Sequence, residues 1–84
     1  MYAQNPFTKT KKAAVGAMTL AVKAQMLLLQ AGVPATVVQL DPTETRRGCA
    51  YGVEFAAVNE LTVRATLRAA RISVSQYIDG GDKL

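Results

Sequence analysis

The residues with the clearest capacity for chemistry form one short run just past the middle of the chain. Cys49 is the only cysteine, and Arg46, Arg47 and Gly48 precede it directly. Neighbouring positive charge stabilises a thiolate relative to a thiol, and the thiolate is the nucleophilic form of cysteine. Gly48 and Ala50 are small and leave the sulfur open. The run therefore predicts a site in which Cys49 is the nucleophile and the arginines stabilise an anion.

The cysteine count also limits what else this site can hold. The chain has one cysteine and no histidine, so it lacks an internal disulfide partner and the usual ligands for zinc or an iron-sulfur cluster. We therefore expect no cofactor and no metal. A lone thiol without a disulfide partner fits a reducing compartment, and the sequence predicts a cytoplasmic protein.

Length and composition predict one folded domain. The chain has 84 residues, of which 50% are hydrophobic and 19% charged, a balance typical of globular proteins. Its net charge is +4, but Lys9, Lys11 and Lys12 near the N-terminus supply much of it. We expect an N-terminal extension over residues 1–10, a domain over 11–79 and a flexible tail over 80–84.

The apolar run over residues 13–29 raises the question of a membrane segment or a secretory signal with Ala24 at its cleavage site. Lys23 and Gln25 interrupt the run, and a lysine at the bilayer centre costs roughly 2.5–3.5 kcal/mol. We therefore assign the run to the folded domain and expect no contact with a membrane.

Periodicity predicts two strands and a helix in the first half of the chain. Residues 11–17 are short and apolar after a basic start, as in a buried strand. Thr19 is the predicted N-cap of a helix with a broad buried face, which ends where Gly32 suits a left-handed C-cap and Pro34 follows. Residues 35–40 are β-branched and predict the second strand.

The second half repeats the order strand, helix, strand. Residues 51–57 alternate, with Tyr51, Val53, Phe55 and Ala57 on one face, and predict a strand with one side on the core. Asn59 is the predicted cap of a second helix that runs to about Ala70. Residues 72–78 complete the pattern as a strand, with Ile72, Val74 and Ile78 on one face and Tyr77 on the other.

The resulting βαββαβ order predicts an α+β, ferredoxin-like two-layer sandwich: a four-stranded antiparallel sheet with two helices on one face. In this topology the connection between the second and third strands emerges at the sheet end where the first helix begins. Cys49 should therefore approach Thr19, where backbone N–H groups and the helix dipole favour a thiolate. Arg71, at the end of the second helix, should lie near the same end.

Each of these features also has a purely structural interpretation. A lone cysteine in a domain of this kind is often a small buried hydrophobe. Arg64, Arg68 and Arg71 suit the solvated face of a helix. A nucleic-acid function is disfavoured, because Tyr51 and Phe55 share a face with core residues and do not form the exposed aromatic platform of RNA-binding sheets.

One family resemblance extends over residues 11–78. The segment 18–34, then a strand, a proline-containing loop and the segment 47–55 with Cys49 at its head, resembles the small bacterial family of selenium/sulfur carrier-like proteins. The resemblance implies a single-domain protein, or a module of a larger one, whose Cys49 would carry sulfur or selenium between donor and acceptor proteins. We expect a carrier or accessory protein more than a stand-alone enzyme.

Three functions follow as hypotheses. The first is the sulfur or selenium carrier, with Cys49 as nucleophile and Arg46, Arg47, Gly48, Ala50 and Thr19 around the bound group. The second is a non-catalytic interaction or assembly module, which dimerises through its sheet or an edge strand and contacts anionic partners through its arginines. The third is a redox-sensing thiol that forms an intermolecular disulfide.

Overall fold

The protein folds as an α+β sandwich in a computed structural model that describes residues 9–41, 43 and 50–82. The elements follow one another as β1 (Lys9–Gly16), α1 (Met18–Gln30), β2 (Ala35–Gln39), β3 (Tyr51–Ala56), the short 3₁₀ helix η3 (Ala57–Asn59), α2 (Glu60–Ala69) and β4 (Gln76–Asp82). The predicted βαββαβ order is confirmed.

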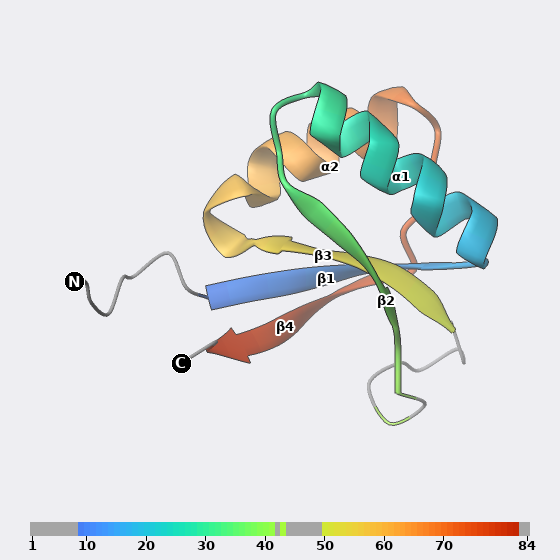
Figure 1. Ribbon diagram of the computed structural model, residues 1–84, viewed down its shortest axis with the longest axis vertical. Coiled ribbons are helices and arrows are strands. Elements are labelled where there is room, and N and C mark those ends of the chain that lie inside the picture. The colour runs from blue at the N-terminus through green and yellow to red at the C-terminus, as the bar shows by residue number, and fades with distance from the viewer. Residues whose placement is uncertain (1–8, 42, 44–49, 83–84) are drawn as a thin grey trace.

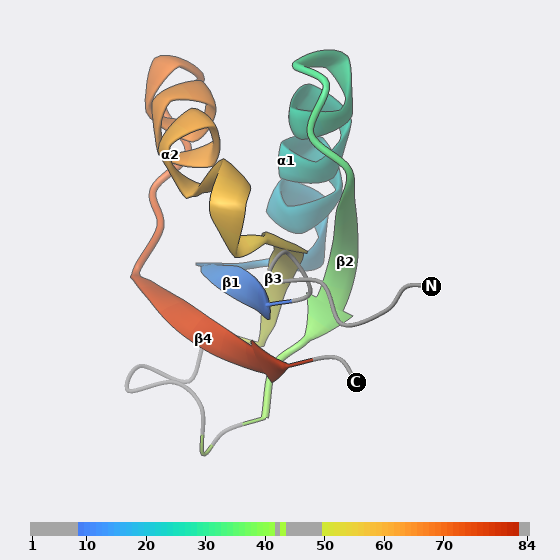
Figure 2. The same cartoon turned by 90° about the vertical axis from the view of Figure 1, so that its left-hand side faces the viewer.

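The four strands form one antiparallel sheet in the order β2-β3-β1-β4. Both helices cover the same face of this sheet, and no helix within the described residues covers the other face (Figures 1 and 2). β1 and β3 are central, whereas β2 and β4 are edge strands with a single neighbour each. This is the ferredoxin-like arrangement that the sequence predicts.

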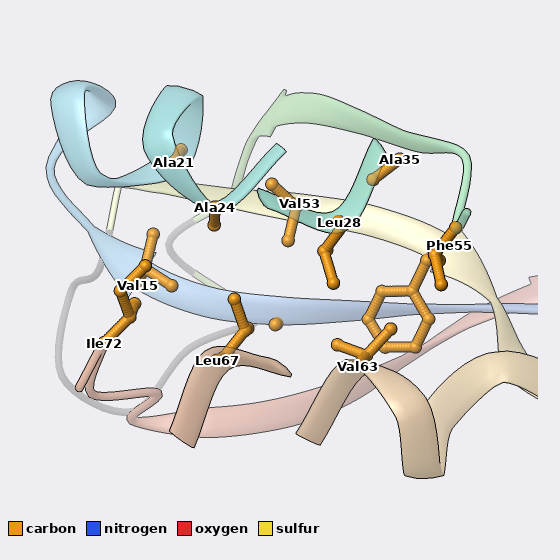
Figure 3. Packing of buried hydrophobic residues seen from close by; sticks show 12 residues of the cluster. Val15, Ala21, Ala24, Leu28, Ala35, Val53, Phe55, Val63, Leu67 and Ile72 are labelled. Atoms are coloured by element: carbon orange, nitrogen blue, oxygen red, sulfur yellow. The ribbon is translucent and has the colours of Figure 1, made fainter. Parts of the chain in front are cut away.

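The hydrophobic core lies between the helices and the sheet. Leu28, Val63 and Leu67 come from the helices and are at most 1% exposed, and they meet Val53 and Phe55 of β3. Figure 3 shows these side chains pointing toward one another between the two layers. The predicted alternation of β3 is confirmed, since Val53 and Phe55 are buried and Tyr51 packs against the core.

Helix α1 differs from its prediction in two respects. Its N-cap is Ala17, in an extended conformation and without a side-chain cap, so Thr19 lies inside the first turn and is not the N-cap. Its buried face is also narrow. Only Ala21, Ala24 and Leu28 are buried, and the other large apolar residues of the predicted broad face are partly or largely exposed. None of the described helices is long and apolar enough to span a membrane.

The C-terminus of α1 has the predicted form. Gly32 adopts a left-handed conformation with φ of 84°, and its N–H donates to the carbonyl of Leu29 at 3.0 Å. The N–H of Val33 donates to the carbonyl of Leu28 at 2.8 Å. This pair of bonds is a Schellman motif, which satisfies carbonyls at the helix end.

The C-terminal part of the chain departs most from the prediction. β4 begins at Gln76, so Ile72 and Val74 lie in the connection before it, and the strand continues into the segment predicted as a polar tail. Tyr77 pairs with Ala13 and lies on the core side of the sheet, and the predicted facing of β4 is therefore wrong.

The first strand begins earlier than predicted. Lys9 and Thr10, predicted as part of the N-terminal extension, belong to β1.

Gly52 lies in β3 directly against the backbone of β1, the other central strand. It pairs with Ala14, directly before the register shift that leads to the Gly16–Tyr51 pair. A Cβ atom at Gly52 would collide with the carbonyl oxygen of Ala13 and lie 3.3 Å from the Cα atom of Ala14. Both contacts are with backbone, which cannot turn away as a side chain can. The sheet therefore requires glycine at this position.

Gly52→Ala should destabilise the domain by about 2–3 kcal/mol, in the upper part of the usual range for overpacking, because the two central strands must separate to admit the methyl group. Gly32→Ala is the control: its Cβ meets open space, so the only cost is the left-handed backbone, about 1 kcal/mol. Urea denaturation of the three proteins measures both changes. Equal losses in the two variants would contradict the steric account of Gly52.

Candidate binding groove between α2 and β4

The predicted sulfur site lies mostly outside the described residues. Arg46, Arg47, Gly48 and Cys49 belong to the segment 44–49, of which the structure gives no description. Ala50 is described and is exposed. Its carbonyl oxygen accepts a hydrogen bond from the N–H of Leu40 at 2.7 Å. The structure thus fixes the two ends of the connection and leaves the role of Cys49 as a prediction.

The ends of this connection lie where the topology predicts. Tyr51, the first residue of β3, pairs with Gly16 at the end of β1 and with Gln39 at the end of β2. The connection therefore leaves and re-enters the sheet beside the turn that leads into α1. Thr19 is exposed in the first turn of that helix. The strand ends therefore lie as the βαββαβ topology predicts, and the approach of Cys49 to Thr19 stays a prediction.

The end of α2 reaches the same end of the sheet. The N–H and the hydroxyl group of Ser75, just before β4, donate to the carbonyl oxygen of Ala14 at 2.9 and 3.2 Å. Ala14 lies near the end of β1. The segment from Arg71 to Ser75 therefore runs from the end of α2 down to this end of the sheet (Figure 1). Arg71 thus lies at the predicted end of the domain.

A second site, which the sequence did not predict, lies between α2 and the edge strand β4. It is an open groove of about 220 Å³, which we call the basic groove. Two arginines, Arg64 and Arg68, border it one helical turn apart. The remainder of its lining is apolar or aromatic: Leu67, Ile72, Val74 and Tyr77.

Arg64 is held in place by contacts on two sides. Its Nε donates to Glu60 Oε2 at 2.8 Å, and a second guanidinium nitrogen lies 2.7 Å from the same oxygen. Its Cζ lies 4.1 Å from the ring centre of Tyr77, a cation–π contact. Hydrogen bonds from Arg64 and then Lys11, whose Nζ is 3.0 Å from Glu60 Oε1, lower the pKa of Glu60. Arg64 therefore shapes the groove from a fixed position.

Tyr77 forms part of the floor. Its ring packs edge to face on Phe55, with centroids 6.5 Å apart and planes at 79°. Partial burial raises the pKa of Tyr77, while the positive charges of Arg64 and Arg68 oppose that rise. Tyr77 is thus a neutral hydroxyl at neutral pH beside two guanidinium groups. Neutral donors and cations together suit an anionic group.

Arg68 is the more available of the two arginines. It is exposed on the last turn of α2 and forms no ion pair with any residue in the described ranges. A guanidinium group can bind a carboxylate through two parallel hydrogen bonds. The groove therefore combines one fixed cation, one available cation and an apolar floor.

Arg71, which is not among the residues that line the groove, places a positive charge at the end of α2 in an unusual conformation. α2 ends in the same Schellman motif as α1. The N–H of Arg71 donates to the carbonyl oxygen of Arg68 at 3.0 Å, and the N–H of Ile72 donates to that of Leu67 at 2.9 Å. In this motif Arg71 takes the position that Gly32 takes in α1, and its φ is 60°. A left-handed conformation costs a residue with a Cβ about 1–2 kcal/mol. Stability alone would favour glycine at this position.

Metal binding and similarity to known proteins add no further assignment. Within the described ranges, no three acidic, histidine or cysteine side chains lie close enough together to hold a metal ion. No family model matches the chain, and comparisons with curated proteins and with solved structures give no match. The resemblance to sulfur and selenium carriers accordingly stays a prediction from the residues.

Arg71→Gly should stabilise the domain by about 0.5–1 kcal/mol, because the relief of left-handed strain exceeds the added entropy of the unfolded chain. Arg71→Ala removes the charge but keeps the strain, so its stability should stay close to that of the wild type. Urea denaturation of all three proteins separates the two contributions. If the alanine and glycine variants were equally stable, backbone strain at Arg71 would be refuted.

Proposed function

We propose that this chain is a small protein-interaction module whose basic groove binds an acidic segment of a partner protein. The observation that supports the proposal is the combination of Arg68, fixed Arg64 and an apolar floor that includes Tyr77. A ligand with a carboxylate beside an apolar side chain complements both parts of the groove. Neither a purely charged nor a purely apolar ligand would do so.

The partner's acidic group should contact Arg68 first. Arg64 already forms an ion pair with Glu60, which also pairs with Lys11. A new anion would therefore bind Arg64 with a smaller gain in free energy than it would bind Arg68. Arg68 would exchange water for a charge-assisted hydrogen bond, a gain of about 1.5–3 kcal/mol. Arg71 supports this interpretation, because it keeps a positive charge at the helix end where glycine would be more stable.

The test uses a defined probe, an acetylated peptide of alternating glutamate and leucine. In a ¹⁵N NMR titration it should shift the amide signals of Arg68, Val74 and Tyr77. Arg68→Glu should weaken binding at least about tenfold, since it removes one charge-assisted contact and adds repulsion. The same peptide with glutamine in place of glutamate should bind correspondingly weakly.

Lys23→Glu is the matched control. Lys23 is exposed on α1 and the substitution makes the same change in net charge, so binding should be nearly unchanged at about 0.15 M salt, where the Debye length is about 8 Å. If this variant lost as much affinity as Arg68→Glu, net charge alone would explain binding and the groove would not be the site.

A second candidate function is the sulfur or selenium carrier, in the reducing environment of the cytoplasm. What supports it is that β2 ends and β3 begins at the sheet end where α1 starts, with Cys49 between those two strands in the sequence. A helix N-terminus, together with Arg46 and Arg47 in the sequence, favours an anionic sulfur. Donor and acceptor proteins would then be the partners.

The transfer itself requires no redox partner. The Cys49 thiolate would attack the outer sulfur of a donor persulfide, the donor's S–S bond would break, and the donor cysteine would leave as a thiolate. The outer sulfur then forms a persulfide on Cys49 and keeps its proton. Because the chain has no second cysteine, the acceptor's own thiolate must remove that sulfur by the same exchange.

Alkylation of Cys49 across a pH series tests this candidate. The fitted thiol pKa should lie below the ordinary value of about 8.5 and should rise in the Arg46→Ala/Arg47→Ala variant. Intact mass of protein purified without reductant should show an added mass of about 32 Da for sulfur or about 80 Da for selenium, which thiol removes. A pKa at or above about 8.5 in the wild type would contradict the carrier function.

A further inference from the structure

Helix α1 exposes an apolar stripe along one side. Met18, Val22, Met26 and Leu29 are 53%, 41%, 55% and 52% exposed. Their spacing of four, four and three places them on one side of the helix, about a third of a turn from the buried side. Four large apolar side chains in a row are more than the single exposed residues that any surface carries. We call these four residues the α1 stripe.

The α1 stripe faces the β2 side of the domain. Gln25, between the stripe and the buried side, donates from Nε2 to the carbonyl oxygen of Ala35 in β2 at 3.0 Å. Leu29 of the stripe borders a shallow cavity together with Ala35 and Thr36. Figure 2 shows α1 and β2 together at one side of the molecule, opposite α2 and β4. The stripe and the β2 edge therefore form one continuous surface.

The edge of β2 has none of the features that keep edge strands apart. Its five residues, Ala-Thr-Val-Val-Gln, include no charge, proline or glycine, and they pair with β3 without a register shift. β4, the other edge, has a register shift and the sequence Asp-Gly-Gly-Asp at its end. Charges, bulges and irregular ends protect an edge from further pairing. Of the two edge strands that the structure describes, β2 is the one without such protection in its own residues.

The charge distribution on this surface indicates which partner would supply the strand that pairs with β2. Lys23 is the only charged residue of α1, and helix geometry turns it about 100° away from Val22. Within the described residues, the α1 stripe and β2 themselves carry no charge, and Glu54 of β3, which accepts a hydrogen bond from Thr10, lies at the border of this surface. Two chains of net charge +4 can therefore meet through the α1 stripe and β2 without like charges opposing each other there.

We propose that a second copy of this chain covers the surface formed by the α1 stripe and the β2 edge. An isologous pair would run β2 antiparallel to β2 of the second copy, centred on Val37, with Thr36 opposite Val38 of that copy. The sheet would continue across both chains, with all helices on one face. The two stripes would then meet above the joined strands and bury each other.

Sedimentation equilibrium and light scattering of the full chain test the proposal. Small interfaces usually have dissociation constants between about 10 μM and about 1 mM. As the protein concentration rises through this range, the average mass should rise toward twice the monomer's 9.0 kDa. Hydrogen exchange of β2 amides should slow over the same range. Val22→Lys should raise the dissociation constant at least about tenfold, and Met26→Lys should do the same.

Leu61→Lys is the matched control, an exposed apolar residue of α2 that is 83% exposed and lies outside the proposed contact. It should dimerise like the wild type. The proposal is overturned if the wild type stays monomeric at about 1 mM with β2 exchange independent of concentration, or if Leu61→Lys weakens association as much as Val22→Lys. Each variant should keep the monomer's fold, because the substituted side chains are exposed; circular dichroism checks this.

Discussion

The close approach of the two central strands is the constraint on which the rest of the structure depends. Gly52 has no space for a side chain against the backbone of β1, and its neighbours there, Ala13 and Ala14, are completely buried. Of these small residues, Ala13 belongs to the core between the sheet and the helices, whereas Ala14 and Gly52 lie outside that cluster. α1 contributes Ala21, Ala24 and Leu28 to this core, α2 contributes Val63 and Leu67, and β3 contributes Val53 and Phe55.

This tight centre has a consequence for the surface. A helix that packs through alanines buries only a narrow strip, so its remaining large apolar residues stay outside. The α1 stripe is therefore a result of how the core is built, and α2 behaves in the opposite way. α2 buries Val63 and Leu67 and presents arginines outward. The fold thus has an apolar side at α1 and β2 and a basic side at α2 and β4.

Local patterns allowed most of the fold to be predicted from the sequence. The alternation of Tyr51, Val53 and Phe55 identified a strand with one buried face, and Gly32 with Pro34 identified the end of α1. The prediction of the last strand was wrong because Ile72 resembles a strand residue but belongs to the end of α2, where its N–H donates to the carbonyl oxygen of Leu67. Local periodicity cannot distinguish the two cases. The error carried over to Tyr77, which was assigned to the wrong face.

The same limitation explains what was missed at the surface. Arg64 and Arg68 were visible as a helix edge, but their groove needs Tyr77, which only the pairing of β4 with β1 brings beneath them. Conversely, the predicted position of the Cys49 connection depended on topology alone, and its two ends lie as expected. Features set by strand order were predictable, whereas features set by the exact register of one strand were not.

The two proposed surfaces reinforce each other, because they lie on opposite sides of the molecule (Figure 2). A dimer joined through β2 would leave β4 and the basic groove of each copy at the two far ends of the extended sheet. Two grooves held at a fixed distance bind a partner with two acidic segments more tightly than either groove alone, with no new contact. Weak binding at each open groove would then suffice for a stable complex, and the affinity would depend on the dimer.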